Sequence, residues 1–132
     1  MSLFGLFQRK HTPTDKTATS LPPEEHLVVI QFFYGIEDLS ELHELEEQLH
    51  SNITNSNLGR YEGHDISLDF GDGYLYFNGK NAEQLFEAIK PILEQHYFMD
   101  KSIATLRFGA FENPDARERD CTIRFSKLAA SN

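Results

Sequence analysis

The fold class is decided by residues 65–98, DISLDFGDGYLYFNGKNAEQLFEAIKPILEQHYF, which predict a β-hairpin followed directly by an amphipathic helix. Polar and apolar residues alternate over residues 65–70 and again over residues 74–78, as they do in strands with one buried face. Between these strands, Gly71-Asp72-Gly73 supplies residues that tolerate the positive φ angles of a tight hairpin turn. The stretch therefore predicts two antiparallel strands that pair with each other.

The helix that follows is expected to run from about Ala82 to about His96. Asn81 and Gln84 have the spacing of a capping box, in which each side chain satisfies a backbone N–H of the first turn. The apolar positions recur at helical spacing: Ala82, Leu85, Phe86, Ile89, Ile92 and Leu93. Pro91 lacks a backbone N–H, so a kink is expected there.

Working outward, the rest of the chain predicts further strands and one more helix. Residues 27–34, LVVIQFFY, form the nearly continuous apolar run that is typical of a buried strand. In a second helix, Asp38 and Glu41 are placed as N-cap and reciprocal acid. Its apolar stripe consists of Leu39, Leu42, Leu45, Leu49 and Ile53. The remaining predictions are a strand entry at 58–62, a bend or bulge at Gly63-His64, a strand at 102–109, a charged loop at 112–120 and an edge strand at 121–126.

These elements occur in the order β-α-β-β-α-β, with an additional strand at the C-terminus. That order predicts a ferredoxin-like α+β fold, in which two helices cover one face of an antiparallel sheet. Residues 8–25 are rich in Thr, Pro and charge, and residues 1–25 are predicted to be a flexible tail. Residues 26–127 are predicted to form a single α+β domain, and residues 128–132 a disordered C-terminus.

Strand alternation also predicts which residues face the helices and which face outward. The expected inward residues are Val28, Ile30, Phe32, Ile66, Leu68, Phe70, Leu75, Phe77, Ala104, Leu106 and Phe108. The expected outward residues are Gln31, Phe33, Ser67, Asp69, Tyr74, Tyr76, Thr105 and Arg107. Tyr and Arg are enriched at protein interfaces, so Tyr74, Tyr76 and Arg107 are candidates for contact with a partner or a second copy of the chain. The alternative is a solvated sheet face on which the tyrosines stabilise the hairpin.

A series of short motifs between residues 59 and 109 resembles a group of small uncharacterised bacterial proteins. The motifs are GRYEGH at 59–64, LYFNG at 75–79, NAEQLFEAIKPIL at 81–93 and LRFG at 106–109. In that group a G-x-x-D/E-G turn precedes a Y-F/Y-x-G-x-x-A-x-x-L-F-x-A-I-x-P-x-L helix and an L-R-Y/F-G strand. The resemblance covers roughly residues 27–125 and implies an α+β fold and a bacterial source. It brings no catalytic residues.

The chain is acidic, with 12 Lys and Arg against 21 Asp and Glu in 132 residues. Residues 21–132 hold 9 Lys/Arg and 20 Asp/Glu, a net charge of −11. Such charge argues against non-specific nucleic-acid binding, because phosphate would be repelled. No apolar run approaches the roughly 20 residues of a membrane helix, so no transmembrane segment is expected. Cys121 is the only cysteine, which excludes an intrachain disulfide and fits a reducing cytoplasm.

The acids concentrate between residues 37 and 47, a segment without Lys or Arg. They are Glu37, Asp38, Glu41, Glu44, Glu46 and Glu47. Six exceed what helix capping requires, and like charges at spacings of three and four destabilise a helix. We interpret Glu41, Glu44 and Glu47 as contacts for a basic protein partner, with a solvated helix face as the alternative.

The sequence predicts no catalytic, metal or cofactor site. His43, Glu46, Glu47 and His50 share a helix face at spacings that can ligate zinc, but no further ligand is evident. Asp72 is explained by turn chemistry, and Cys121 by the packing of a small core residue. We therefore predict a non-catalytic protein-binding module, most concretely an immunity- or antitoxin-type inhibitor of a basic toxin. The alternative is a regulatory module that binds a small ligand or self-associates through its sheet.

Overall fold

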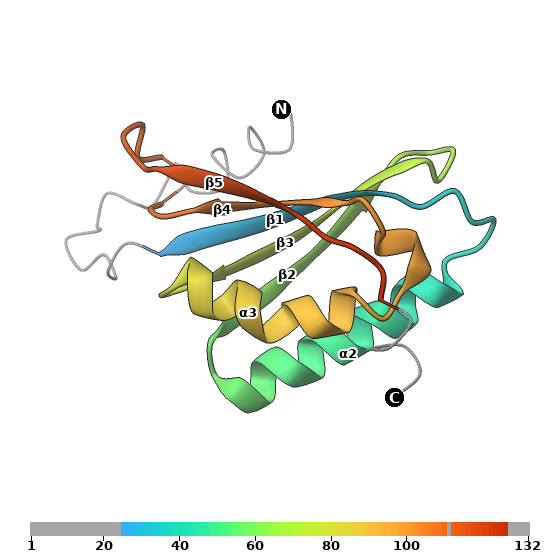
Figure 1. Ribbon diagram of the computed structural model, residues 1–132, viewed down its shortest axis with the longest axis horizontal. Helices are drawn as coiled ribbons and strands as arrows, with labels where there is room; N and C mark the ends of the chain where they lie inside the picture. Colours follow the sequence, from blue (N-terminus) through green and yellow to red (C-terminus); the bar gives the residue numbers. More distant parts are fainter. Residues whose placement is uncertain (1–24, 111, 127–132) are drawn as a thin grey trace, which may run out of the picture.

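One five-stranded antiparallel sheet carries both helices on a single face (Figure 1). This computed structural model describes residues 25–110 and 112–126. In chain order the elements are β1 (His26–Phe33), α2 (Ser40–Ser56), β2 (Gly59–Ile66), β3 (Asp72–Gly79), α3 (Ala82–Leu93), the 3₁₀ helix η2 (Tyr97–Met99), β4 (Ile103–Arg107) and β5 (Glu118–Thr122). The predicted α+β class, with two helices on an antiparallel sheet, is confirmed. The predictions of a flexible tail and a disordered C-terminus fall outside the described residues, apart from Glu25.

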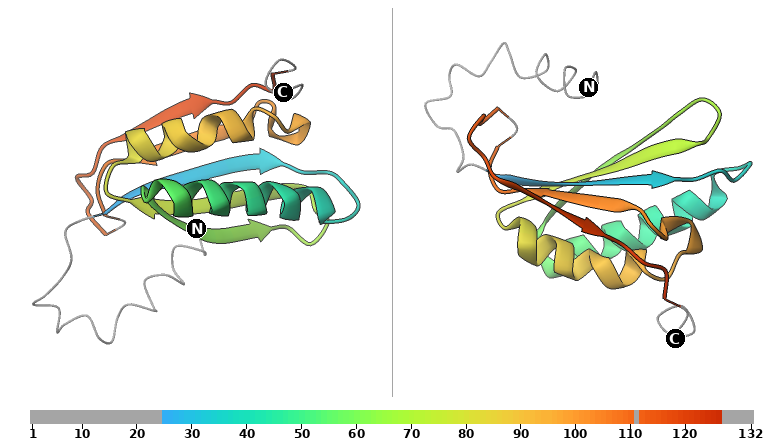
Figure 2. Two further views of the ribbon diagram at one scale, coloured as in Figure 1. Left: turned by 90° about the horizontal axis from the view of Figure 1, so that it is seen from below. Right: turned by 45° about the horizontal axis from the view of Figure 1, so that its top comes forward.

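The strand order is β2-β3-β1-β4-β5, which places β1 at the centre of the sheet. Val29 of β1 lies opposite Tyr76 of β3 on one side and opposite Thr105 of β4 on the other. The register between β2 and β3 shifts between Tyr61 and Gly63, where the sequence predicted a bend or bulge. In Figure 2 the two helices lie side by side beneath the sheet, and its other face carries no helix of the described residues.

The core lies between the sheet and the helices and is built from the expected inward positions of β1, β3 and β4. The buried residues of these strands are Val28, Ile30, Phe32, Leu75, Phe77, Ala104 and Leu106. Helix α2 contributes Leu42, Leu45, Leu49 and Ile53, and α3 contributes Ala82, Leu85, Phe86, Ile89 and Leu93. Burial of this apolar surface is the main force that holds the helices on the sheet.

Asp38 and Tyr34 together fix the start of α2. The Asp38 carboxylate accepts hydrogen bonds from the Ser40 backbone N–H (2.8 Å) and hydroxyl (2.5 Å). The buried Tyr34 hydroxyl donates to the Asp38 carbonyl (2.6 Å) and accepts from the Leu42 N–H (3.2 Å). Asp38 was predicted as the N-cap, but Leu39 occupies that position and Asp38 acts one residue earlier. Tyr34 thus satisfies an N–H of the first turn that has no partner within the helix.

The hairpin prediction was wrong for residues 67–70, which form a turn instead of the end of a strand. Ser67 N–H donates to the Asp72 carbonyl (2.9 Å), and the Ser67 hydroxyl accepts from the N–H groups of Gly71 (3.0 Å) and Asp72 (3.1 Å). These bonds replace a sheet ladder, because Ser and Asp side chains offer the backbone a local alternative. Leu68, predicted to face the helices, is therefore fully exposed. Phe70 and Ile66 remain partly buried against the core.

Two other boundaries also differ from the predictions. Strand β5 lies over Glu118–Thr122 and not over 121–126, because the charged residues first assigned to a loop pair with β4. Glu118 lies opposite Arg107 and Asp120 opposite Thr105, so each pair brings polar side chains together. Helix α3 ends at Leu93, two residues after Pro91, and not at about His96. Among the described residues, no helix combines the length and apolar character needed to cross a membrane.

Candidate partner-binding surfaces

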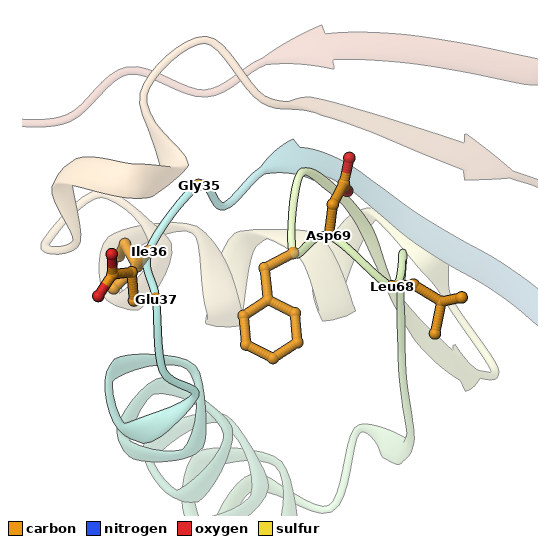
Figure 3. A pocket seen from close by; sticks show the side chains of 6 residues that line it. Gly35, Ile36, Glu37, Leu68 and Asp69 are labelled. Carbon is orange, nitrogen blue, oxygen red and sulfur yellow. The ribbon is translucent and has the colours of Figure 1, made fainter.

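A small cavity of about 260 Å³ opens at the end of the sheet, between the β1–α2 loop and the β2–β3 turn. It is lined by Gly35, Ile36, Glu37, Leu68, Asp69 and Phe70. Figure 3 shows Ile36 and Glu37 on the β1–α2 loop and Leu68 and Asp69 on the β2–β3 turn, with the carboxylates of Glu37 and Asp69 directed to different sides. The cavity thus combines three apolar side chains with two carboxylates.

Backbone hydrogen bonds hold the two walls of this cavity together. Tyr34 N–H donates to the Gly71 carbonyl (2.6 Å) and Gly35 N–H to the Phe70 carbonyl (2.7 Å). Gly35 and Phe70 both have positive φ angles, +66° and +61°. Glycine adopts this conformation at little cost, but Phe does so rarely, and strained residues of this kind gather at functional sites. The cavity is therefore pre-organised by its own backbone.

The two segments around the cavity are strongly acidic. Residues 35–44 and 67–72, which we call the acidic end, contain no Lys or Arg and six acids. These acids are Glu37, Asp38, Glu41, Glu44, Asp69 and Asp72. The Ser67 hydroxyl and then the Gly71 N–H lower the pKa of Asp69, and hydrogen bonds from Ser40 lower the pKa of Asp38. Both carboxylates therefore stay charged at neutral pH.

The arginines that form ion pairs lie in the strands away from this end. Arg60 of β2 pairs with Glu25 (3.1 Å) and Glu62 (3.1 Å). Arg119 of β5 pairs with Glu83 of α3 (2.7 Å). Within residues 25–110 and 112–126, by contrast, no ion pair involves an acid of the acidic end.

Helix α2 uses its acids in two different ways. Glu46 faces β2, where its carboxylate accepts a hydrogen bond from the Tyr61 hydroxyl (2.5 Å) and lies 2.7 Å from His64 Nδ1. Burial, and then Glu46, raises the pKa of Tyr61, so the phenol keeps its proton. Glu44 and Glu47, both predicted contacts, are exposed and take part in no ion pair of the described residues.

Glu41, the third predicted contact on α2, is partly buried and lies with Glu44 on the side toward His96. His96 Nε2 is 2.8 Å from Gln48 Oε1, which joins the end of α3 to α2. Burial lowers the pKa of His96, while the negative charges of Glu44 and Glu41 act in the opposite direction. Glu41 and Glu44 therefore form an acidic stripe beside a histidine that stays neutral at pH 7.

The predicted contacts on the open sheet face lie in two separate settings. Tyr74 and Tyr76 are half-buried neighbours on β3, with ring centroids 6.1 Å apart and planes at 16°. Burial, and then Asp65, raises the pKa of Tyr76. Arg107 is instead engaged within the chain: it donates to Glu118 (2.7 Å) and to the carbonyls of Ala110 (3.2 Å) and Asn113. The rings of Tyr74 and Tyr76 are therefore partly accessible on this face, whereas the Arg107 side chain stabilises the loop between β4 and β5.

The large exposed apolar side chains were largely missed by sequence reasoning. In the part of the chain that the structure describes they are Phe33, Leu68 and Tyr97, of which only Phe33 was expected on the surface. Phe33 ends β1, Leu68 lies in the β2–β3 turn and Tyr97 lies in η2, so all three occur at the end of the sheet near the cavity. The signal for Leu68 was the Ser67-x-Asp69 pattern, since such side chains favour turns.

The structure offers no metal-binding constellation within its described residues. On the helix face that was considered as a zinc site, the Glu46 carboxylate contacts the Tyr61 hydroxyl and His64 Nδ1. The ring centroids of His43 and His64 are 6.4 Å apart. Cys121 is partly buried and packs against the core. These side chains have structural roles in the fold.

Comparisons with known proteins gave no match that bears on the function of these surfaces. No protein-family model matches the chain. Searches of curated proteins and of solved structures also gave no match.

Proposed function

We propose that this chain is a non-catalytic module that binds a basic protein through its acidic end and the outward side of α2. Its most concrete form is an immunity- or antitoxin-type inhibitor that covers a basic toxin in the cytoplasm. The observation that carries this proposal is the division of acids on α2: Glu46 is satisfied inside the chain, whereas Glu44 and Glu47 are left to solvent.

Electrostatics supports a basic partner. Six acids occur in the acidic end without a Lys or Arg, so these two segments contribute only negative formal charge. Such a surface accelerates association with a positive partner and disfavours partners that are negatively charged. Two of these acids, Asp38 and Asp69, have lowered pKa values and so keep their charge under mildly acidic conditions.

Exposed apolar side chains beside these charges support a protein as the partner. Leu68 is fully exposed and Phe33 is 75% exposed, so both lose solvent contact if a protein covers this end. Binding hot spots combine an apolar anchor with surrounding polar groups that exclude water. The acidic end supplies both parts of that arrangement.

The test is capture of partners from a lysate of the source cells by the tagged full-length chain, at about 50 mM and about 500 mM NaCl. We expect one basic protein, captured at low salt and released at high salt because the steering charges are screened. The triple variant Glu41→Gln, Glu44→Gln, Glu47→Gln should bind that protein about tenfold more weakly or worse.

The matched control is the triple variant Glu87→Gln, Glu112→Gln, Asp115→Asn, which removes the same charge from exposed sites elsewhere. It should bind as the wild type does. If the two triple variants lose affinity equally, net charge and not this surface determines binding. If the captured protein is an enzyme, equimolar addition of the chain should abolish its activity.

The strand arrangement supports a ferredoxin-like interpretation of the fold. Strand β3 lies between β1 and β2, and β1 lies between β3 and β4, all antiparallel to their neighbours. This interleaving supports the split βαβ pattern, with β5 as an added edge strand. We propose this topology, and with it the resemblance to small bacterial α+β proteins, as the structural background of the binding module.

Self-association through the open sheet face is a second candidate, favoured by the stacked rings of Tyr74 and Tyr76. Leu27, Val29 and Ile103 are only partly buried on the same face, with no helix of the described residues above them. Sedimentation equilibrium should then give a dimer for the wild type and a folded monomer for Tyr74→Ala with Tyr76→Ala. A wild-type monomer at high concentration would rule this candidate out.

A further inference from the structure

We propose that residues 3–7, LFGLF, cover the open sheet face of their own chain. This face is the side of the five-stranded sheet opposite α2 and α3, and no helix of the described residues lies on it (Figure 2). The inference is independent of the basic partner, and it gives the face a different occupant from the second copy of the chain that self-association requires. It rests on the apolar centre of the face, the composition of residues 3–7, the point at which the chain enters the sheet and the length of the connection.

The centre of the open sheet face is apolar and only partly buried. Val29 of β1 lies in the middle, opposite Tyr76 of β3 on one side and Thr105 of β4 on the other. The partly buried apolar and aromatic side chains of this face are Leu27, Val29, Tyr74, Tyr76 and Ile103. Covering such side chains with another apolar segment is favourable by about 25 cal/mol for each Å² of apolar surface removed from water.

Residues 3–7 have the composition of a segment that gains from burial. Leu3, Phe4, Leu6 and Phe7 place large apolar side chains at four of these positions. In residues 8–24 of the sequence, by contrast, Leu21 is the only large apolar side chain. So short a segment cannot form a core of its own, and burial of its side chains therefore requires a surface that is already folded.

Glu25 shows on which side of the sheet the chain enters β1. Its carboxylate accepts two hydrogen bonds from the Arg60 guanidinium of β2, at 3.2 and 3.1 Å. Arg60 lies opposite Asn78 of β3, and Asn78 lies opposite Leu27 of β1, so these three side chains share the open side of the sheet. The Glu25 side chain is therefore held on the side that residues 3–7 are proposed to cover.

The connection is long enough for this contact. Residues 8–24 join residues 3–7 to Glu25, and 17 residues reach at most about 56 Å. A chain of that length without regular structure has an r.m.s. span of about 21–25 Å. The 8 residues of β1 extend over about 26 Å, so residues 3–7 reach the centre of the face without stretching. A short tether also gives an effective concentration in the millimolar range, at which a weak contact is populated.

Charge favours the same contact. Residues 1–20 hold 3 Lys/Arg and 1 Asp/Glu, the difference between the whole chain (12 and 21) and residues 21–132 (9 and 20), so a net charge of +2 is joined to one of −11. Asp65 of β2 and Asp120 of β5 are exposed on the outer strands of the open sheet face. Neither forms an ion pair within residues 25–110 and 112–126. Arg9 and Lys10 closely follow the apolar residues and are attracted to these carboxylates.

The experiment measures paramagnetic relaxation in the ¹⁵N-labelled full-length chain with a nitroxide at residue 2. The nitroxide is attached through Ser2→Cys in a Cys121→Ala background, because Cys121 is the only cysteine. We expect the amides of Val29, Tyr76 and Thr105 to lose most of their peak intensity, while amides on the outward side of α2, behind the sheet, keep most of theirs. A mixture of ¹⁵N-labelled chain without nitroxide and unlabelled chain with nitroxide should show no loss, because the contact is intramolecular.

Phe4→Ser with Phe7→Ser should remove the localised loss of intensity, because it removes the largest apolar side chains of the segment. The matched control is Phe4→Leu with Phe7→Leu, which keeps apolar side chains at both positions and should preserve the loss. Both variants lie outside the strands and helices of the described residues, so they leave the core unchanged. On the face itself, Tyr76→Ser should weaken the contact, whereas Tyr97→Ser, at an exposed tyrosine of η2, should not.

A loss of intensity spread evenly over the domain, or a localised loss that persists in Phe4→Ser with Phe7→Ser, would overturn the inference. Loss of intensity in the mixed sample would assign the open sheet face to a second copy of the chain and would also overturn it. None of these outcomes depends on the capture of a basic partner, so the proposed function stands or fails separately.

Discussion

Glu46 and Glu47 are neighbours on α2, yet the two sides of this helix use their acids in opposite ways. On the side toward β2, the Glu46 carboxylate joins Tyr61 and His64 across the gap between helix and sheet. On the outward side, Glu47 is exposed, and no ion pair of the described residues includes it. The first side stabilises the fold, and the second leaves negative charge available to a partner. The number of acids on a helix therefore does not locate a binding surface. The location is indicated by the acids that have no ion-pair or hydrogen-bond partner within the described residues.

The largest expected effect is the loss of stability in Glu46→Ala. Truncation leaves the partly buried Tyr61 hydroxyl without its acceptor, which should lower the free energy of unfolding by about 2 kcal/mol. Glu47→Ala, one residue along, should change it by less than about 0.5 kcal/mol. Urea denaturation at pH 7 measures both. Equal effects of the two variants would remove the distinction between the two sides of the helix.

Tyr34→Phe should have the next largest effect, because it removes the hydroxyl that joins the end of β1 to Asp38 and to the first turn of α2. The variant leaves the Leu42 N–H, at the buried start of the helix, without a partner. We expect a loss of about 1–2 kcal/mol in the free energy of unfolding, measured in the same denaturation experiment. Amide hydrogen exchange should also become faster for residues 35–42. Unchanged exchange there would mean that Tyr34 does not organise the acidic end.

Gly35→Ala tests the backbone of the cavity with a smaller change. No atom lies within 4 Å of a Cβ placed at this position, so the cost comes from the positive φ of +66° and not from a clash. We expect a loss of about 1 kcal/mol in the free energy of unfolding. Asn tolerates this conformation better, so Gly35→Asn should be less destabilising. Equal losses for the two variants would show that side-chain size and not φ limits this site.

The smallest expected effect is a pH dependence that arises from His96. Burial lowers the pKa of His96, so as the pH falls below 6.5 the unfolded chain binds a proton before the folded chain does. The folded state therefore loses stability between pH 7 and pH 5, although Glu44 and Glu41 reduce this loss. His96→Gln removes the titration, so its stability relative to wild type should rise as the pH falls across this range. A pH-independent difference would contradict the assigned cause.

The sequence predicted the α+β class and most of the core because those depend on periodicity. Buried positions such as Leu45 and Phe77 recur at the spacing of their element, and this signal survives errors at the element ends. The turn at Ser67 was missed because Ile66-Ser67-Leu68-Asp69-Phe70 also alternates as a strand does. The turn is stabilised by hydrogen bonds of the Ser67 hydroxyl to the N–H groups of Gly71 and Asp72, and a hydropathy pattern does not record such bonds.

The candidate surfaces were only partly predictable, because the sequence of one segment does not show which side chains of other strands and helices it contacts. Arg107 looked available for a partner, but it donates to Glu118, which lies eleven residues further along on β5, and to the Ala110 carbonyl in the loop between the two strands. The same holds for Glu46, whose partners lie on β2. The cavity joins residues 35–37 to residues 68–70, a proximity that only the strand order β2-β3-β1 creates.

The most direct test of the central claim is the affinity of the captured partner as a function of salt, measured by calorimetry for the wild type and for Glu41→Gln, Glu44→Gln, Glu47→Gln. If the outward acids of α2 bind a basic surface, the wild-type affinity should fall steadily as salt rises. The triple variant should bind more weakly at low salt and show a shallower salt dependence. An affinity that changes neither with salt nor with these three substitutions would contradict the account.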